Sequence, residues 1–131
     1  MKTLIAEDDF TSRLLLQNVL APYGECHVAV NGREAVRGFR MARQDGSPYD
    51  LVCLDILMPE MDGLAVLKEI RAIEEAAGIL SSSGAKVIMT TGLADPKNVI
   101  EAFRGLCDGY LPKPFDKGKL LAQLESLGVI R

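Results

Sequence analysis

Five short apolar runs alternate with segments of helical periodicity along this chain, and that alternation leaves few folds open to it. The apolar runs, each expected to be a strand, cover residues 2–6, 26–30, 50–54, 86–90 and 109–111. Strands that alternate with helices form βαβ units, whose parallel sheet is covered by helices on both faces. We therefore predict an α/β fold, a (βα)5 doubly wound sheet of five parallel strands. Residues 1–131 are expected to make one domain, without an output domain.

Three of the expected helices begin with a recognisable capping residue. Asp9 or Thr11 can cap the first helix, and Asp116 can cap the last. Asp95 directly precedes a proline, which suits the first helical position, so another helix is expected over about residues 95–106. These caps divide the chain into the strand and helix segments that a doubly wound sheet requires.

Composition and charge exclude several classes of protein. The chain is 48% hydrophobic and 25% charged, as is usual for a soluble globular protein, and its net charge of −3 has no compensating local cluster of Lys and Arg. We therefore expect no direct contact with nucleic acid. No apolar stretch is long enough to span a membrane and no signal-peptide pattern is present, so a cytoplasmic protein with reduced cysteines is expected. Cys26, Cys107 and His27 do not have the spacing of zinc ligands.

Polar side chains stand just past four of the expected strands. Asp8 and Asp9 follow the first strand, Asp55 follows the third, residues 90–91 are threonines that end the fourth, and Lys113 follows the fifth. The site of an open α/β sheet lies beyond the carboxyl ends of its strands, so these groups should meet at one edge. Carboxylates crowded in this way raise one another's pKa unless a cation lies among them. The sequence therefore predicts an acidic, cation-binding site at this edge.

The same positions carry motifs of a known family. The chain resembles the receiver domain of bacterial two-component response regulators, and the small stand-alone chemotaxis-type (CheY-like) regulators are nearest to it in size. The resemblance covers essentially the whole chain and implies a flavodoxin-like sheet with strand order 2-1-3-4-5. The motifs that carry it are Glu7-Asp8-Asp9-Phe10, Leu54-Asp55, Met58-Pro59, Met61-Asp62-Gly63, Met89-Thr90-Thr91-Gly92 and Tyr110-Leu111-Pro112-Lys113-Pro114-Phe115.

The resemblance implies that Asp55 is a phosphoacceptor, which takes a phosphoryl group from a phosphohistidine of a sensor histidine kinase. A carboxylate is already a nucleophile at neutral pH and needs no activating base. Asp8 and Asp9 would hold Mg²⁺ (or Mn²⁺) together with Asp55, and the backbone carbonyl of Leu57 would be a further ligand. Hard cations of this kind prefer such oxygen ligands.

Three further residues acquire roles from the same resemblance. Lys113 would neutralise the phosphoryl oxygens, and the hydroxyl of Thr91 would move toward them. The ring of Tyr110 would then turn inward, which makes Thr91 and Tyr110 the switch, although a half-buried strand aromatic is an equally good interpretation of Tyr110. Residues 99–106, Tyr110 and the last helix would form the surface that partners read. The Lys113–Pro114 peptide bond is expected to be cis.

Two leucines stand at the positions that tune phosphoryl lifetime in the family. Leu57 lies two residues beyond Asp55, and Leu93 lies two residues beyond Thr91. Neither side chain can hydrogen-bond an attacking water, and both could shield the acyl phosphate. Our hypothesis is slow self-dephosphorylation, although both leucines could also simply cover apolar surface.

Other functions fit the sequence less well. A haloacid dehalogenase also uses a strand-end Asp nucleophile, but it needs a second acid two residues on, where this chain has Leu57. A degenerate receiver would lack some of the site residues, and a nucleotide-binding protein would have a glycine-rich loop after a strand. The sequence does not identify the downstream partner, which could be a phosphotransfer protein or another effector, and it does not settle homodimerisation. Residues 74–84 are expected to form a long connection between a helix and a strand, whose role the sequence does not decide.

Overall fold

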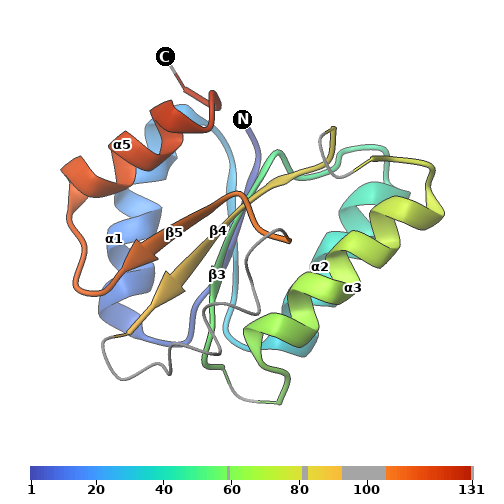
Figure 1. The fold of residues 1–131 in the computed structure, drawn as a ribbon, viewed down its shortest axis with the longest axis horizontal. Coiled ribbons are helices and arrows are strands. Elements are labelled where there is room, and N and C mark those ends of the chain that lie inside the picture. The colour runs from blue at the N-terminus through green and yellow to red at the C-terminus, as the bar shows by residue number, and fades with distance from the viewer. Residues whose placement is uncertain (59, 81–82, 93–105, 131) are drawn as a thin grey trace.

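The computed structural model describes residues 1–58, 60–80, 83–92 and 106–130. Within them the chain forms one five-stranded parallel sheet in the order β2-β1-β3-β4-β5, which confirms the predicted α/β fold (Figure 1). The strands are β1 (Thr3–Ala6), β2 (Cys26–Ala29), β3 (Leu51–Asp55), β4 (Lys86–Thr91) and β5 (Gly109–Pro112). The helices are α1 (Phe10–Leu20), α2 (Gly32–Gln44), α3 (Gly63–Ala76) and α5 (Lys117–Ser126), with a short 3-10 turn at Ala21–Tyr23. Nearly all of the helix expected over 95–106 lies outside the described residues.

The helices form one layer on each face of the sheet. Helices α1 and α5 cover one face, and α2 and α3 cover the other (Figure 1). Strand β3 lies in the middle and is buried along its whole length, with Val52 and Leu54 facing α2 and α3 while Leu51 and Cys53 face α1 and α5. Each large apolar side chain buried in this way contributes about 1.5–3 kcal/mol. The described part of the chain contains no helix with the length and apolar character of a membrane span.

Strands β3, β4 and β5 each end one residue beyond the prediction, and two of the added residues belong to the predicted site. Asp55 is the last residue of β3, where it pairs in register with Thr90, and Thr91 is the last residue of β4. The ladder continues because Ile56 N donates to Thr90 O at 3.2 Å. Asp55 and Thr91 are therefore held by sheet hydrogen bonds rather than by a loop, so their side chains start from a rigid backbone.

Aspartate and asparagine side chains cap the described helices. Asp9, one of the two caps that the sequence offers for α1, accepts from Ser12 N at 3.0 Å, and Asp116, where the last helix was expected to start, accepts from Lys119 N at 2.8 Å. Asn31 and Asp62 cap α2 and α3 in the same way. Each such cap contributes about 1 kcal/mol, and each one fixes the point at which a loop at the sheet edge turns into a helix.

The loop that follows β3 passes very close to the start of α3. A Cβ atom on Gly63 would lie 2.6 Å from the carbonyl oxygen of Asp55 and 2.8 Å from Cα of Ile56. The amide of Gly63 donates to Ile56 O at 2.8 Å. Only glycine fits this approach, so Gly63 fixes the path of the backbone directly behind the Asp55 side chain.

A buried ion-pair network occupies the opposite end of the sheet. Arg71 binds Glu74 at 2.8 Å and Asp108 at 3.1 Å, and it also donates to the carbonyls of Ala85 and Leu106. The sequence suggested a connection from residue 74 onward, but Glu74 belongs to α3 and is only 1% exposed. The network therefore joins α3 to the starts of β4 and β5.

Candidate functional site

The carboxyl ends of four strands bring the predicted polar residues to one edge of the sheet. Glu7 and Asp8 follow β1, Asp55 ends β3, Thr91 ends β4, and Lys113 follows β5. Carboxylate oxygens of Glu7, Asp8 and Asp55 all lie within 4.8 Å of one another. The predicted acidic site thus exists as a compact cluster, although its membership differs from the prediction by one residue.

Asp55 lies at the centre of this cluster and is 5% exposed. Its Oδ2 is 3.5 Å from Lys113 Nζ, and its Oδ1 accepts a long hydrogen bond of 3.4 Å from the backbone amide of Leu57. The carboxylate is therefore nearly dry but incompletely paired. That combination suits a group that is to gain a further partner.

Glu7 is a member of the cluster that the sequence did not assign to the site. It is fully buried, and its Oε1 lies 2.9 Å from Lys113 Nζ, which is closer to that nitrogen than the Oδ2 of Asp55 is. The Thr90 hydroxyl donates to the same oxygen at 3.5 Å, and the Asp9 amide donates to Oε2 at 3.3 Å. Burial of a charged glutamate is costly unless it is paired and hydrogen-bonded. These partners therefore hold Glu7 at the end of β1.

Asp9 does not lie in the cluster that the structure shows. It was expected to bind metal beside Asp8, but its side chain caps α1 and is exposed. Hydrogen bonds from the Ser12 side chain and amide lower the pKa of Asp9 below its ordinary value. The physical reason is that Asp9 occupies the N-cap position of α1, where a carboxylate accepts hydrogen bonds from the free amide groups of the first turn. Glu7 thus takes the place predicted for Asp9.

The charges at this edge do not balance. Burial is the main cause that raises the pKa of Asp55 to about 8, and hydrogen bonding and charge repulsion from Glu7 add to it. The positive charge of Lys113 lowers the pKa of Asp55, whereas a hydrogen bond with Asp8 raises it further. Burial alone would lower the pKa of Lys113, but contacts with Glu7 and then Asp55 outweigh it, so the pKa rises and the ammonium stays charged. Glu7 and Asp55 therefore share the ammonium group of Lys113, and Asp8 has no ion pair among the described residues.

The donor set fits a hard divalent cation. Glu7, Asp8 and Asp55 offer only oxygen atoms, and Asp8 is exposed to solvent, which leaves room for the waters that such an ion keeps. A divalent charge at this position would also counteract the burial and the carboxylate repulsion that raise the pKa of Asp55. The carbonyl of Leu57 as a further ligand stays a prediction.

The other predicted residues lie around the cluster or outside the described part. Thr91 is 5% exposed and its carbonyl accepts from Lys113 N at 2.6 Å, so it is directly coupled to the lysine backbone. Tyr110 is half-buried and packs against the apolar core on the α2 and α3 side. The Lys113–Pro114 bond is cis, as expected. Leu57 is 60% exposed at the mouth of the site, and Leu93 lies outside the described residues.

Fold and site together define a class, a doubly wound α/β protein with a carboxylate cluster and a lysine at the carboxyl ends of its strands. The family model for the response regulator receiver domain matches residues 3–125. The chain belongs to this family, and it is a response regulator of two-component signalling.

Proteins of two kinds have sequences similar to this one. The chain is 30% identical over 128 residues to the chemotaxis protein CheY of Thermotoga maritima, covering 96% of each chain. It is 38% identical over 120 residues to the regulatory protein AtoC of Escherichia coli, covering 91% of this chain but only 23% of that protein. A solved CheX–CheY–BeF3–Mg²⁺ complex from Borrelia burgdorferi is similar in structure, with a TM-score of 0.78 and 26% identity over 99% of this chain and 90% of that one. The family therefore includes proteins made of this unit and proteins that contain it.

Proposed function

We propose that Asp55 accepts a phosphoryl group from a phosphohistidine of a sensor kinase, with Mg²⁺ held by Glu7, Asp8 and Asp55. The observation that carries this proposal is the state of Asp55 itself. It is a nearly dry carboxylate at the carboxyl edge of the sheet, 3.5 Å from a charged lysine, with its pKa raised to about 8. A carboxylate kept for packing would be fully paired, whereas this one lacks a positive partner of its own.

The transfer needs positioning and charge neutralisation rather than a base. One Asp55 oxygen forms the new P–O bond while the P–N bond of the phosphohistidine breaks, and the electron pair of that bond stays on the imidazole nitrogen, which takes a proton from water. Lys113 would neutralise charge on the phosphoryl oxygens. When bound, Mg²⁺ supplies further positive charge to those oxygens and to the carboxylates.

Deprotonation of Asp55 limits the reaction in the absence of a cation. Because its pKa lies near 8, Asp55 is mostly protonated at pH 7 and is then a poor nucleophile. A divalent charge beside it lowers that pKa, so the acidic cluster makes reactivity depend on metal. The similar Borrelia CheX–CheY complex includes Mg²⁺, which supports this choice of ion.

The surface around the site suits the approach of a protein donor. Phe10 is 65% exposed at the start of α1, Leu14 one turn later is 44% exposed, and Leu57 at the site mouth is 60% exposed. Apolar side chains exposed beside a charged site are typical of a surface that a partner covers. They support docking of the phosphohistidine protein at this edge.

Thr91 and Tyr110 are proposed to carry the signal from the site. Thr91 is joined to Lys113 through a backbone hydrogen bond of 2.6 Å, and Tyr110 lies on the adjoining strand, where Met89 is its register partner. Movement of the Thr91 hydroxyl toward the phosphoryl group would change the packing available to the Tyr110 ring. The surface affected would be β5, α5 and residues 99–106, to which a downstream protein or phosphotransfer partner would bind.

Intact mass spectrometry after incubation with acetyl phosphate and Mg²⁺ tests the proposal. Wild type should gain one phosphoryl group, Asp55→Asn should gain none, and a chelator should suppress the gain. Asp45→Asn, in an exposed loop, is the matched control and should react as wild type does. The proposal fails if Asp55→Asn reacts equally, or if wild type takes no phosphoryl group from acetyl phosphate or from a panel of phosphorylated histidine kinases.

A further inference from the structure

A groove lined by arginines runs between α2 and α3, on the face of the sheet away from α1 and α5. Its largest hollow has a volume of about 420 Å³, and two adjoining hollows of about 380 and 160 Å³ continue it toward the start of α2. Adjacent hollows share Arg40 and Glu69 at one junction and Arg33 and Arg37 at the other. The three hollows therefore form one continuous groove, which we call the α2–α3 groove.

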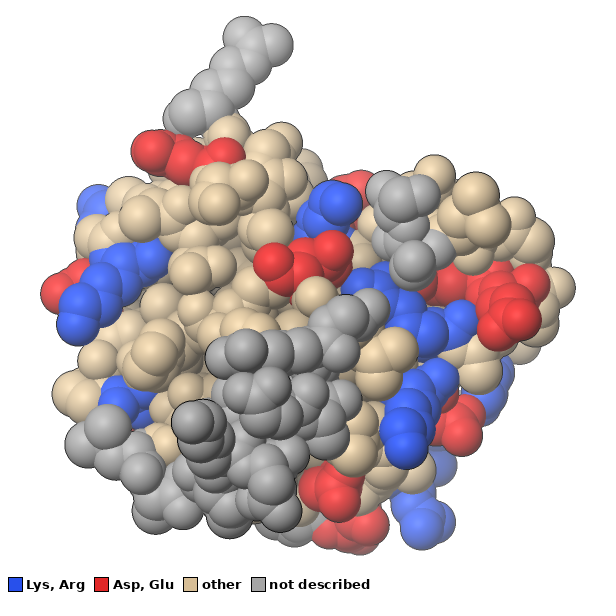
Figure 2. Space-filling view, in the orientation of Figure 1, with Lys and Arg blue, Asp and Glu red and all other residues tan. Residues whose placement is uncertain are grey.

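The fold gathers the basic side chains of this groove from one helix. The sequence showed no local cluster of Lys and Arg, but α2 carries Arg33, Arg37, Arg40 and Arg43 at spacings of three and four residues. Residues so spaced lie along the same side of a helix, over a rise of about 15 Å. Figure 2 shows the blue side chains collected on the part of the surface where Figure 1 draws α2 and α3.

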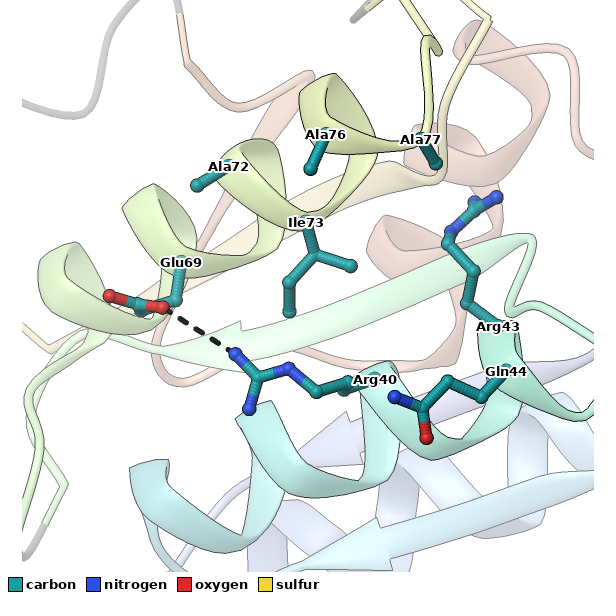
Figure 3. A pocket seen from close by; sticks show the side chains of 8 residues that line it. All are labelled: Arg40, Arg43, Gln44, Glu69, Ala72, Ile73, Ala76 and Ala77. Carbon is teal, nitrogen blue, oxygen red and sulfur yellow. Dashed lines mark ion pairs between the residues drawn. The ribbon is translucent and has the colours of Figure 1, made fainter.

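Most of these arginines have no partner among the described residues. The described ion pairs of the groove consist of Arg40 with Glu69, at 3.9 Å between half-exposed side chains. A pair so long and so exposed contributes little, so Arg40 can turn to another carboxylate. Arg43 reaches across the groove toward Ala77 (Figure 3), and its Nε is buried without a hydrogen-bond partner in the described structure. The groove thus has unused donor capacity that matches carboxylates.

The opposite wall of the groove is small and apolar. Ala72, Ala76 and Ala77 line it along α3, and Ile73 points down between the two helices (Figure 3). These alanines are exposed, so the wall lets a chain approach closely while it offers apolar contact. A ligand for this groove therefore needs carboxylates on one side and small or apolar groups on the other.

We infer that the α2–α3 groove is a docking surface for an acidic segment of a partner protein, whose carboxylates bind the arginines while apolar side chains lie against the α3 wall. About five residues of extended chain span the stripe. Such docking does not depend on phosphoryl transfer at Asp55, because no residue of the groove belongs to the site.

The composition of the groove favours an acidic peptide over nucleic acid. Glu34, Glu60 and Glu69 also line it, and they would repel a continuous row of phosphates. A protein segment can place neutral or basic residues opposite them. None of the residues that line the three hollows is aromatic, so bases would find nothing on which to stack.

Fluorescence anisotropy with three labelled probes tests this inference on the full chain. The probes are a peptide of repeated Glu-Ala-Asp-Leu units, a peptide of repeated Lys-Ala-Lys-Leu units, and oligothymidylate. The acidic peptide should bind most tightly, and Arg37→Glu with Arg40→Glu should weaken it at least about tenfold. The matched control is Lys117→Glu with Lys119→Glu at the exposed start of α5. It makes the same change in net charge on the other face of the sheet and should alter binding of the acidic peptide less than about twofold.

Several results would overturn the inference. The inference fails if the acidic peptide does not bind at about 1 mM, or if the basic peptide or oligothymidylate binds more tightly. It also fails if the arginine variant and the α5 lysine variant lose the same affinity for the acidic peptide. Ala72→Glu, which places a negative charge on the apolar wall, should also weaken the acidic peptide. Circular dichroism melts of all variants show whether they remain folded, and sedimentation shows whether the groove is covered by a second copy of the chain, which would also contradict the inference.

Discussion

Two partly buried clusters of charged side chains lie at opposite ends of the same sheet, and they differ in how their charges are paired. At the amino ends of β4 and β5, Glu74 and Asp108 share Arg71, and Lys86 lies 4.0 Å from Asp108. Two carboxylates there meet two cations. At the carboxyl ends, three carboxylates lie close together, and of these Glu7 and Asp55 share the ammonium of Lys113 while Asp8 has no described ion pair.

The difference separates a structural cluster from a functional one. Glu74 accepts from Arg71 at 2.8 Å and from Ala85 N at 2.7 Å, and Asp108 also accepts from Val87 N at 2.8 Å. Short bonds to fixed donors complete this network, so it holds α3 against the sheet and has no capacity for a ligand. Asp55 meets Leu57 N and Lys113 Nζ at the longer distances of 3.4 and 3.5 Å, and it lies against the carboxyl groups of Glu7 and Asp8, which help to keep its pKa raised. The open cluster is the one that can bind a cation and react.

The largest effect is expected when the fully paired cluster around Arg71, which we call the closed cluster, is broken. Arg71→Met would leave Glu74 buried without a cation, and we expect a loss of about 3–5 kcal/mol in the free energy of unfolding, measured by urea denaturation. Arg40→Met is the matched control, because its pair with Glu69 is long and exposed, and it should cost less than about 0.5 kcal/mol. Equal costs for the two variants would mean that the network is not a closed structural unit.

The membership of the open cluster can be resolved by metal affinity. Glu7→Gln should weaken Mg²⁺ binding about tenfold or more, since it removes one of three clustered carboxylates. Asp9→Asn should change the affinity less than about threefold, because Asp9 caps α1 and asparagine caps a helix equally well. Calorimetric titration of both variants measures this directly. A larger loss in the Asp9 variant would restore the ligand set predicted from sequence.

The smallest effect concerns the surface of the site. If Leu57 and Leu93 shield the acyl phosphate, replacing them with Asn and Glu should speed its hydrolysis several-fold, about 1 kcal/mol in activation free energy. Decay of phosphorylated protein, followed by intact mass, measures the rate. Hydrolysis that is no slower in wild type than in the Leu57→Asn, Leu93→Glu variant would remove the shielding hypothesis.

Much of the fold and part of the site were accessible from sequence. The alternation of apolar runs with helical patterns predicts five parallel strands, and polar residues at strand ends predict where they meet. Asp8, Asp55 and Lys113 were found in this way because each lies at or just past the end of an apolar run. The strand order came from the family resemblance, since crossover rules alone leave several arrangements open.

The rest depends on details that a one-dimensional pattern does not carry. Glu7 and Asp9 flank Asp8, and a shift of one residue in the strand end decides which of them turns into the cluster and which caps the helix. The i, i+3 spacing of Arg71 and Glu74 is also that of an exposed helical ion pair. Its burial requires Asp108, which lies far away in the chain. The arginine stripe of α2 likewise forms only when the helix does.

The stability of metal-free wild type and Asp55→Asn, measured against pH, tests the charge deficit most directly. Asp55 has a pKa of about 8 in the folded state and 3.8 ordinarily, so its favourable contribution is complete below pH 4 and is lost as the pH rises through 8. The free energy of unfolding of Asp55→Asn should therefore match that of wild type near pH 4 and exceed it by about 2–5 kcal/mol at pH 8.5. Saturating Mg²⁺ should raise the free energy of unfolding of wild type by a similar amount and that of the variant much less. A variant no more stable than wild type at pH 8.5, with no effect of Mg²⁺ on either, would contradict the account.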